Sequence, residues 1–149
     1  MEDLKRILMD EIGLYYSERG NVKDQDTLQY VKFRNKNLKQ DMTKGFRQND
    51  IVFDPLNSPK QMESLFKYAI NKDDIEVLSF ANIQNPDGTY KCIVCTNENT
   101  SIESNNYNNP ALSYAESILT LYGNSNVNLS EYDSEEENNK WYLMRDKKE

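Results

Sequence analysis

Hydrophobic and polar residues recur with two different periods between residues 53 and 123, and these periods predict helices and strands. After Ser58-Pro59, apolar residues are spaced three and four apart, which predicts a helix over 58–70. Ser58 is a typical N-cap, Pro59 suits the first helical position, and Gln61 completes a capping-box pattern. The apolar stripe of this helix is wide enough to cover a sheet. It comprises Met62, Leu65, Phe66, Ala69 and Ile70.

Two runs rich in β-branched and aromatic residues, 75–82 and 89–97, follow this helix and predict a β-hairpin. Asp87-Gly88 lies between the runs and suits a tight turn, because glycine accepts a positive φ. Apolar residues occupy both faces of the predicted ribbon. We therefore expect the sheet to be covered on each side or to be extended by another strand.

A polar loop and a second helix complete this unit. Residues 98–108 are rich in Asn, Ser and Glu, which predicts a mobile contact loop with Tyr107 as its one large residue. Asn109-Pro110 then opens a helix that runs through Tyr122 to a C-cap at Gly123. The expected fold is α+β, with a small antiparallel sheet packed between or against helices as an αβ sandwich.

The first part of the chain also begins with helical spacing. Residues 2–18 predict an opening helix that Gly13 weakens in the middle and Gly20 ends. The residues expected to share its buried face are Leu4, Ile7, Leu8 and Tyr15.

Residues 21–50 allow two interpretations. Alternation about Phe33 predicts a short strand, whereas the spacing of Leu38 and Met42 favours a helix. Six basic residues and one acidic residue lie within 32–47, either as a solvated basic face or as a contact for DNA or RNA with an aromatic ring for stacking. The residues of that candidate contact are Lys32, Phe33, Arg34, Lys36 and Lys39.

Charge divides the chain into three parts, with a formal net charge of −7. Residues 1–50, expected to pack on the domain as a helix plus a basic segment, carry ten basic and nine acidic residues. The α-β-β-α core at 51–123 carries four and nine, and the acidic C-terminal extension at 124–149 carries four and seven. This balance disfavours general nucleic-acid binding through a basic surface. It suits either simple solubility or a surface that mimics nucleic-acid phosphates.

The C-terminal extension combines an acidic run with aromatic residues. Three glutamates at 135–137 precede Trp141, which either tucks into the core as part of a last strand or anchors a partner, because Trp and Tyr dominate interface hot spots. The partner-binding residues predicted for this protein are Tyr107, Asp133, Glu135, Glu136, Glu137 and Trp141.

Several kinds of chemistry are disfavoured by residue type. The chain has no histidine, which excludes Ser–His and Cys–His nucleophiles. Cys92 and Cys95 are three apart on a predicted strand, so they face opposite sides and have no further Cys or His to complete a zinc site. The carboxylates at 73–76 are typical of a solvated loop. We expect no enzymatic activity, no metal and no cofactor, and a cytoplasmic protein without a signal peptide or membrane span.

Residues 53–123 resemble the phage ABA-sandwich domain, a small family of phage and prophage genomes. The matching features are Phe53-Asp54-Pro55 before the first helix, Tyr90-Lys91-Cys92 in the second strand, and the helix that begins Asn109-Pro110-Ala111-Leu112-Ser113-Tyr114-Ala115. The match covers about half of the chain, and Tyr90 stands where the family often has Trp. The resemblance implies an α+β sandwich and a viral origin, and it carries over no catalytic residues.

Together these features predict a phage-encoded protein that acts by binding, in the cytoplasm of the infected bacterial host. The most concrete hypothesis is a non-catalytic inhibitor of a host defence system, an anti-CRISPR protein whose acidic side chains block the nucleic-acid channel of a nuclease effector. The alternatives are a nucleic-acid-binding phage regulator that uses 32–47, and a sponge that sequesters a nucleotide signal. Exposed hairpin edges favour pairing between two copies, so a homodimer is one expectation.

Overall fold

The computed structural model describes residues 2–16, 22–28, 34–35, 40–41, 53–97, 99–124 and 127–134, and in these ranges the fold is α+β. The α-helices are α1 (Glu2–Ile12), α2 (Pro59–Lys72) and α3 (Pro110–Leu121), and short 3-10 turns are η1 (Pro55–Asn57) and η2 (Ser130–Tyr132). The strands are β1 (Leu14–Tyr16), β2 (Val22–Asp24), β3 (Arg34–Asn35), β4 (Gln40–Asp41), β5 (Ser79–Gln84), β6 (Tyr90–Cys95) and β7 (Ser101–Glu103).

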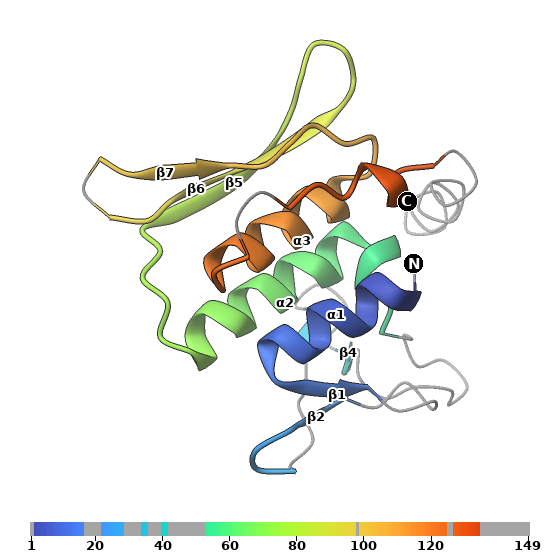
Figure 1. Ribbon diagram of the computed structural model, residues 1–149, viewed down its shortest axis with the longest axis vertical. Helices are drawn as coiled ribbons and strands as arrows, with labels where there is room; N and C mark the ends of the chain where they lie inside the picture. Colours follow the sequence, from blue (N-terminus) through green and yellow to red (C-terminus); the bar gives the residue numbers. More distant parts are fainter. Residues whose placement is uncertain are drawn as a thin grey trace.

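The largest sheet is antiparallel, with strand order β5-β6-β7, and the helices lie on one side of it (Figure 1). Both α2 and α3 contact this sheet: the rings of Phe66 and Tyr114 lie 4.5 and 6.2 Å from the ring of Phe80, centroid to centroid. The β1–β2 hairpin lies at the end remote from the sheet, next to α1 (Figure 1). We call the helix-facing side of the sheet its inner face and the opposite side its outer face.

The predicted helix at 58–70 is confirmed as α2. The hydroxyl of Ser58 accepts a hydrogen bond from the backbone N–H of Gln61 at 3.3 Å, as an N-cap should. The side chain of Gln61 accepts from the backbone N–H of Asp54 at 2.5 Å, which ties η1 to the helix. The residues of the predicted stripe that are fully buried are Met62, Leu65, Phe66 and Ala69.

Helix α3 is the centre of the molecule. Its N-cap, Asn109, accepts from the N–H of Ala111 at 3.0 Å, and Gly123 follows the helix with φ +96°, as a glycine C-cap does. Ten of its 12 residues are buried, because the helix is enclosed by the sheet, α2 and α1. A helix buried on nearly all sides is typical of a core element rather than of a surface helix.

The opening helix is shorter than the sequence predicts. It ends at Ile12, and Gly13 then takes a φ of +84°, which turns the chain into β1. A Cβ at Gly13 would lie 2.6 Å from the Nζ of Lys72, so the end of that flexible side chain would have to shift. The predicted helix over 2–18 is therefore wrong beyond Ile12. Ile7 and Tyr15, expected on the buried face, are 46% and 58% exposed.

The predicted loop at 98–108 also needs correction, because much of it belongs to the sheet. Strand β7 pairs with β6, and Tyr90 and Tyr107 exchange backbone hydrogen bonds of 2.7 and 2.9 Å. The prediction that the sheet is either covered on each side or extended by another strand is confirmed by the extension. Among the described residues, helices cover the inner face and no element covers the outer face.

One hydrophobic core draws on all three parts of the chain. Leu8 and Val22 come from the first fifty residues, Phe66 and Leu112 from the central unit, and Leu129 from the C-terminal extension. Within the ranges given above, no helix is both long and apolar enough to span a bilayer.

Candidate partner-binding surface

Tyr107, predicted as an exposed partner contact, is a core residue with 1% of its surface exposed. Its hydroxyl donates to the Oε1 of Glu116 at 2.5 Å and accepts from the backbone N–H of Leu129 at 2.8 Å. Burial, and then the bond to Glu116, raise the pKa of the phenol. The prediction of an exposed side chain is wrong, because pairing with Tyr90 turns this ring to the inner face of the sheet.

Glu116 is the buried carboxylate of this cluster and was not singled out by the sequence. Besides Tyr107, its oxygens accept from the backbone N–H and the side-chain amide of Asn105 at 2.9 and 2.8 Å. A buried carboxylate is tolerated only when such donors replace water. The signal available in the sequence was one charged residue within the otherwise uncharged run of α3.

The C-terminal segment 127–134 is fastened to the body by several hydrogen bonds, including those of Leu129 and Asp133. Leu129 is buried and bonds through its N–H to Tyr107. The carboxylate of Asp133 accepts from the backbone N–H groups of Asn108 and Asn109 at 2.8 and 3.3 Å. It therefore lies at the N-terminal end of α3, where the helix dipole favours a negative charge. Asp133, predicted as a partner contact, has an internal anchoring role in this structure.

Exposed carboxylates gather where this segment meets α1. Glu131 of η2 and Asp3 of α1 are exposed, with 76% of the Asp3 side chain open to solvent. Burial, followed by the charges of Glu131 and then Asp3, raises the pKa of Tyr132, because nearby carboxylates disfavour the phenolate. Figure 1 shows η2 and the beginning of α1 at the same end of the molecule. We call Asp3, Glu131 and Asp133 the acidic end.

The other predicted partner residues continue the chain beyond this point. Glu135, Glu136, Glu137 and Trp141 lie outside the described residues, and they follow directly on Ser134. Their contribution to partner binding stays a prediction, but the structure defines the position of Ser134, after which they continue the chain.

The candidate nucleic-acid contact lies almost wholly outside the described residues. Arg34 belongs to β3 and is the one residue of this contact that the structure describes. The other four residues are Lys32, Phe33, Lys36 and Lys39. In the backbone register Arg34 is opposite Asp41 of β4. The role of these residues in nucleic-acid binding therefore stays a prediction.

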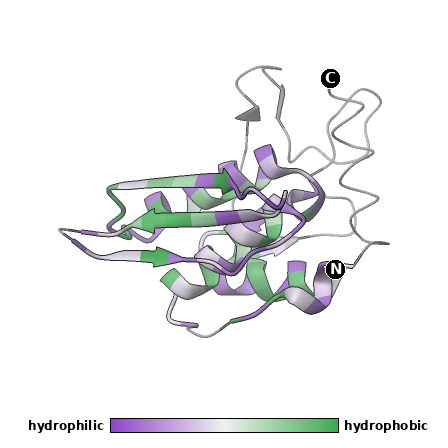
Figure 2. Ribbon diagram, turned by 90° about the horizontal axis from the view of Figure 1, so that it is seen from above, coloured by the Kyte–Doolittle hydropathy of each residue, from purple (hydrophilic) through white to green (hydrophobic). Residues whose placement is uncertain are grey.

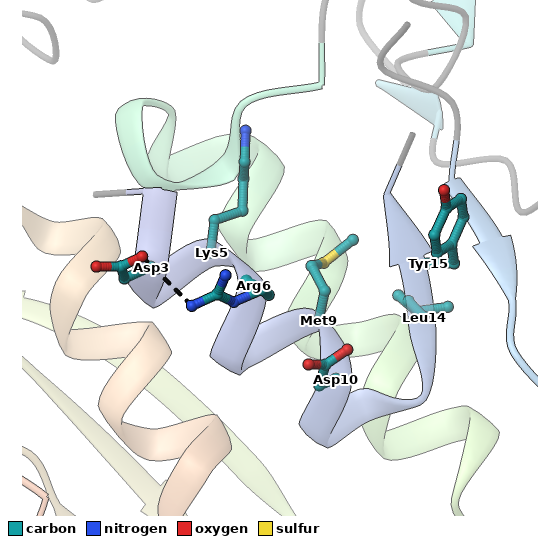
Figure 3. A pocket seen from close by; sticks show the side chains of 7 residues that line it. All are labelled: Asp3, Lys5, Arg6, Met9, Asp10, Leu14 and Tyr15. Carbon is teal, nitrogen blue, oxygen red and sulfur yellow. Dashed lines mark hydrogen bonds and ion pairs between the residues drawn. The ribbon is translucent and has the colours of Figure 1, made fainter. Parts of the chain in front are cut away.

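A cleft of about 360 Å³ opens between α1 and β1 (Figure 3). Its charged side chains already have internal contacts: Arg6 reaches Asp3 at 3.4 Å, and Asp10 accepts from the amide of Gln25 at 3.2 Å. The cleft therefore has mixed charge and paired side chains. Its lining residues are Asp3, Lys5, Arg6, Met9, Asp10, Leu14 and Tyr15.

The two cysteines face opposite sides of the sheet, as predicted. Cys92 is fully buried on the inner face, where burial raises the pKa of its thiol to about 11, and Cys95 is half-buried on the outer face. In the predicted solvated loop, Asp73 and Glu76 are exposed and accept from Tyr122 and Asn97, respectively. The described part of the chain has no group of three or more Cys, Asp or Glu arranged to hold a metal ion.

Comparison with known proteins does not assign this fold to a family. No family model matches the chain, and no curated protein or solved structure is significantly similar to it. The resemblance to the phage ABA-sandwich domain therefore stays an expectation from the sequence.

Proposed function

We propose that this protein is a non-catalytic inhibitor that binds a partner protein through its acidic end, continued by the glutamates at 135–137 and by Trp141. The observation that supports this proposal is the attachment of segment 127–134 to the body through Leu129 and Asp133. Both contacts hold this segment against the loop before α3, where Tyr107 and Asn108 lie. The glutamate run at 135–137 therefore starts from a fixed place on the folded body. A fixed starting point reduces the conformational freedom that binding would otherwise remove.

The chemistry of this surface suits a basic groove. Clustered carboxylates attract cationic surfaces and can occupy positions that nucleic-acid phosphates would take. Trp141 adds a large side chain suited to anchoring such a contact. The partner class is therefore a nucleic-acid-binding protein of the host or of its defence system. With the viral origin that the resemblance implies, the first candidate is a CRISPR nuclease effector, which makes the protein an anti-CRISPR inhibitor.

A truncation tests this proposal directly. The chain shortened after Ser134 keeps the described core, including both fastening contacts. We expect it to remain folded by circular dichroism but to bind the effector at least roughly tenfold more weakly in a calorimetric titration. We also expect binding of the full chain to weaken as salt rises from about 0.1 to about 0.5 M, because salt screens exposed charges. Full inhibition by the truncated chain, or binding insensitive to salt, would contradict the proposal.

A matched pair of charge reversals distinguishes binding through the acidic end from attraction by the net charge of the whole chain. Glu131→Lys changes the acidic end, whereas Glu76→Lys makes the same change in charge beyond the far end of α2. We expect the first to weaken binding several-fold and the second to change it little. Equal effects would show that total charge, rather than this surface, attracts the partner.

Capture from a bacterial lysate separates the proposal from its two alternatives. Retention of a single nucleic-acid-binding protein supports inhibition by protein contact. Retention of DNA or RNA by the purified chain supports a regulator that uses 32–47, and a nucleotide found by native mass spectrometry supports a sponge. Either of the last two results would overturn the proposed function.

A further inference from the structure

The outer face of the β5–β6–β7 sheet is more apolar than a solvated sheet face normally is. An antiparallel sheet with one solvated face normally alternates apolar residues inward with polar residues outward. Here the outward positions of the two longer strands are mainly apolar. In strand order they are Ser79, Ala81 and Ile83 on β5, Lys91, Ile93 and Cys95 on β6, and Ser101 and Glu103 on β7.

These outward side chains are accessible. Ala81 is exposed, Ile83 is 38% exposed, and Ile93 and Cys95 are half-buried. Ala81 and Ile93 are directly opposite each other in the register, so the apolar residues form one continuous group. Figure 2 shows that all three strands include hydrophobic segments. A contiguous apolar surface of this kind is typical of an interaction site.

The charges of the outer face are balanced, in contrast to the rest of the chain. Lys91 and Glu103 are the charged residues at the outward positions, and their Nζ and Oε2 atoms lie 3.6 Å apart. The face is thus neutral, while the whole chain has a formal charge of −7. A strongly basic partner has little electrostatic attraction to a neutral face. Two acidic chains, by contrast, can approach each other where neither presents excess negative charge.

We propose that the outer face binds a second copy of this chain, sheet against sheet. A two-fold axis in the plane between the sheets, passing between Lys91 and Glu103, brings each lysine opposite the glutamate of the other copy. Such an interface is self-complementary in charge, as a two-fold contact requires. The apolar residues of the two copies then meet in the middle, as in face-to-face packing of β-sheets. This surface is distinct from the acidic end, so the proposal does not depend on the proposed function.

The area of the outer face sets the expected strength of self-association. Strands β5 and β6 have six residues each and β7 has three. With neighbouring strands about 4.8 Å apart, the face covers on the order of 250 Å² in projection. Stable interfaces bury about 800 Å² per partner, so this contact belongs to the weak class. We expect a reversible dimer whose population grows with concentration over roughly 10 µM to 1 mM.

Sedimentation of the full chain over that concentration range is the test. We expect the wild-type sedimentation coefficient to rise with concentration, and the Ile83→Arg variant to weaken association at least tenfold. Ile7→Arg is the matched control, because Ile7 is exposed on α1 away from this face, and it should associate like the wild type. A wild-type chain that stays monomeric would overturn the proposal and leave the face to another partner or to solvent. Equal loss in the control would overturn it as well.

Charge exchange tests the two-fold arrangement without disturbing the apolar residues. Lys91→Glu and Glu103→Lys should each weaken self-association, since like charges then meet across the axis. An equimolar mixture of the two variants should associate more strongly than either alone, because each pairs its charges with the opposite charges of the other. A mixture no stronger than the separate variants would overturn this arrangement. Circular dichroism of each variant confirms that the fold is retained.

Discussion

The inner and outer faces of the β5–β6–β7 sheet consist of alternate residues of the same strands, yet their surroundings are opposite. Val94 and Cys92 point inward and are fully buried against the helices, whereas Ile93 and Cys95 point outward and stay accessible. The four residues are of similar apolar character, so residue type alone does not separate the faces. Their difference arises from α2 and α3, which cover one face only among the described elements.

Polar groups differ between the faces in the same way. On the inner side, Asn82 donates to the hydroxyl of Ser113 at 2.5 Å, and Tyr107 bonds to Glu116, so each has a specific internal partner. On the outer side, Lys91 and Glu103 form a partly exposed ion pair. Internal polar contacts support the fold because no water can replace them, whereas an exposed pair contributes little. The comparison therefore predicts large effects of inner-face changes and small effects of outer-face changes.

The largest expected effect is that of a buried charge on the inner face. Val94→Asp places a carboxylate where the side chain is fully buried, and we expect a loss of more than about 4 kcal/mol in the free energy of unfolding. Urea denaturation measures this loss. If the variant does not fold, Val94→Ala should still cost about 2 kcal/mol.

The adjacent residue is the control for this change. Ile93→Asp introduces the same charge one position along β6 but on the outer face, so it should cost less than about 1 kcal/mol. Comparable losses for Ile93→Asp and Val94→Asp would show that the two faces do not differ in burial as described.

The two cysteines provide a chemical version of the same comparison. Because burial raises the pKa of Cys92 to about 11, roughly one thiol in a thousand is ionised at pH 8. We expect Cys95 to react with a thiol reagent at least about a hundredfold faster in the native protein, equivalent to about 2.7 kcal/mol. A colorimetric thiol assay of the Cys95→Ala variant isolates Cys92. Rapid reaction of that variant without denaturant would contradict the burial of Cys92.

Loss of one buried hydroxyl should have an intermediate effect. Tyr107→Phe keeps the ring but removes the donor to Glu116 and the acceptor for the N–H of Leu129, at an expected cost of about 1–3 kcal/mol. Thermal and urea denaturation measure it. Tyr15→Phe removes a hydroxyl from an exposed ring and should change stability by less than about 0.5 kcal/mol. Equal effects of the two substitutions would exclude a supporting role for the Tyr107 hydroxyl.

The smallest expected effect is that of a mild polar substitution on the outer face. Ile93→Thr keeps a β-branched side chain that suits a strand, so the monomer should lose less than about 0.5 kcal/mol at low protein concentration. The measurement is a urea titration performed where association is negligible. A loss of several kcal/mol would mean that Ile93 is packed inside the monomer.

Local signals in the sequence predicted α2, α3 and the β5–β6 hairpin, although β5 begins at Ser79 rather than at residue 75 as predicted. Ser58-Pro59 and Asn109-Pro110 specify helix starts because their side-chain oxygens and missing N–H groups suit the first turn wherever it occurs. Asp87-Gly88 likewise specifies a turn, and the N–H of Gly88 bonds to the carbonyl of Asn85 at 2.9 Å. These preferences depend on a few neighbouring residues, which is why they could be read directly from the chain.

Candidate site residues were less predictable, because their roles depend on distant partners. Nothing near Tyr107 in sequence indicates that its hydroxyl bonds to Leu129, 22 residues further on, or that Asp133 reaches back to Asn108, 25 residues away. The acidic character of the C-terminal extension was evident from composition. The point at which it is fastened to the body was not.

The amino-acid sequence by itself thus specified where α2 and α3 begin, where the hairpin turns, and that both faces of its strands are apolar. Folding in three dimensions added β7, buried Tyr107 and Glu116, and ended α1 at Ile12. It also left one face of the sheet uncovered by any of the described elements. The physical reason is that caps and turns are satisfied by hydrogen bonds between near neighbours. Strand pairing and burial, in contrast, depend on segments that meet only when the chain is compact.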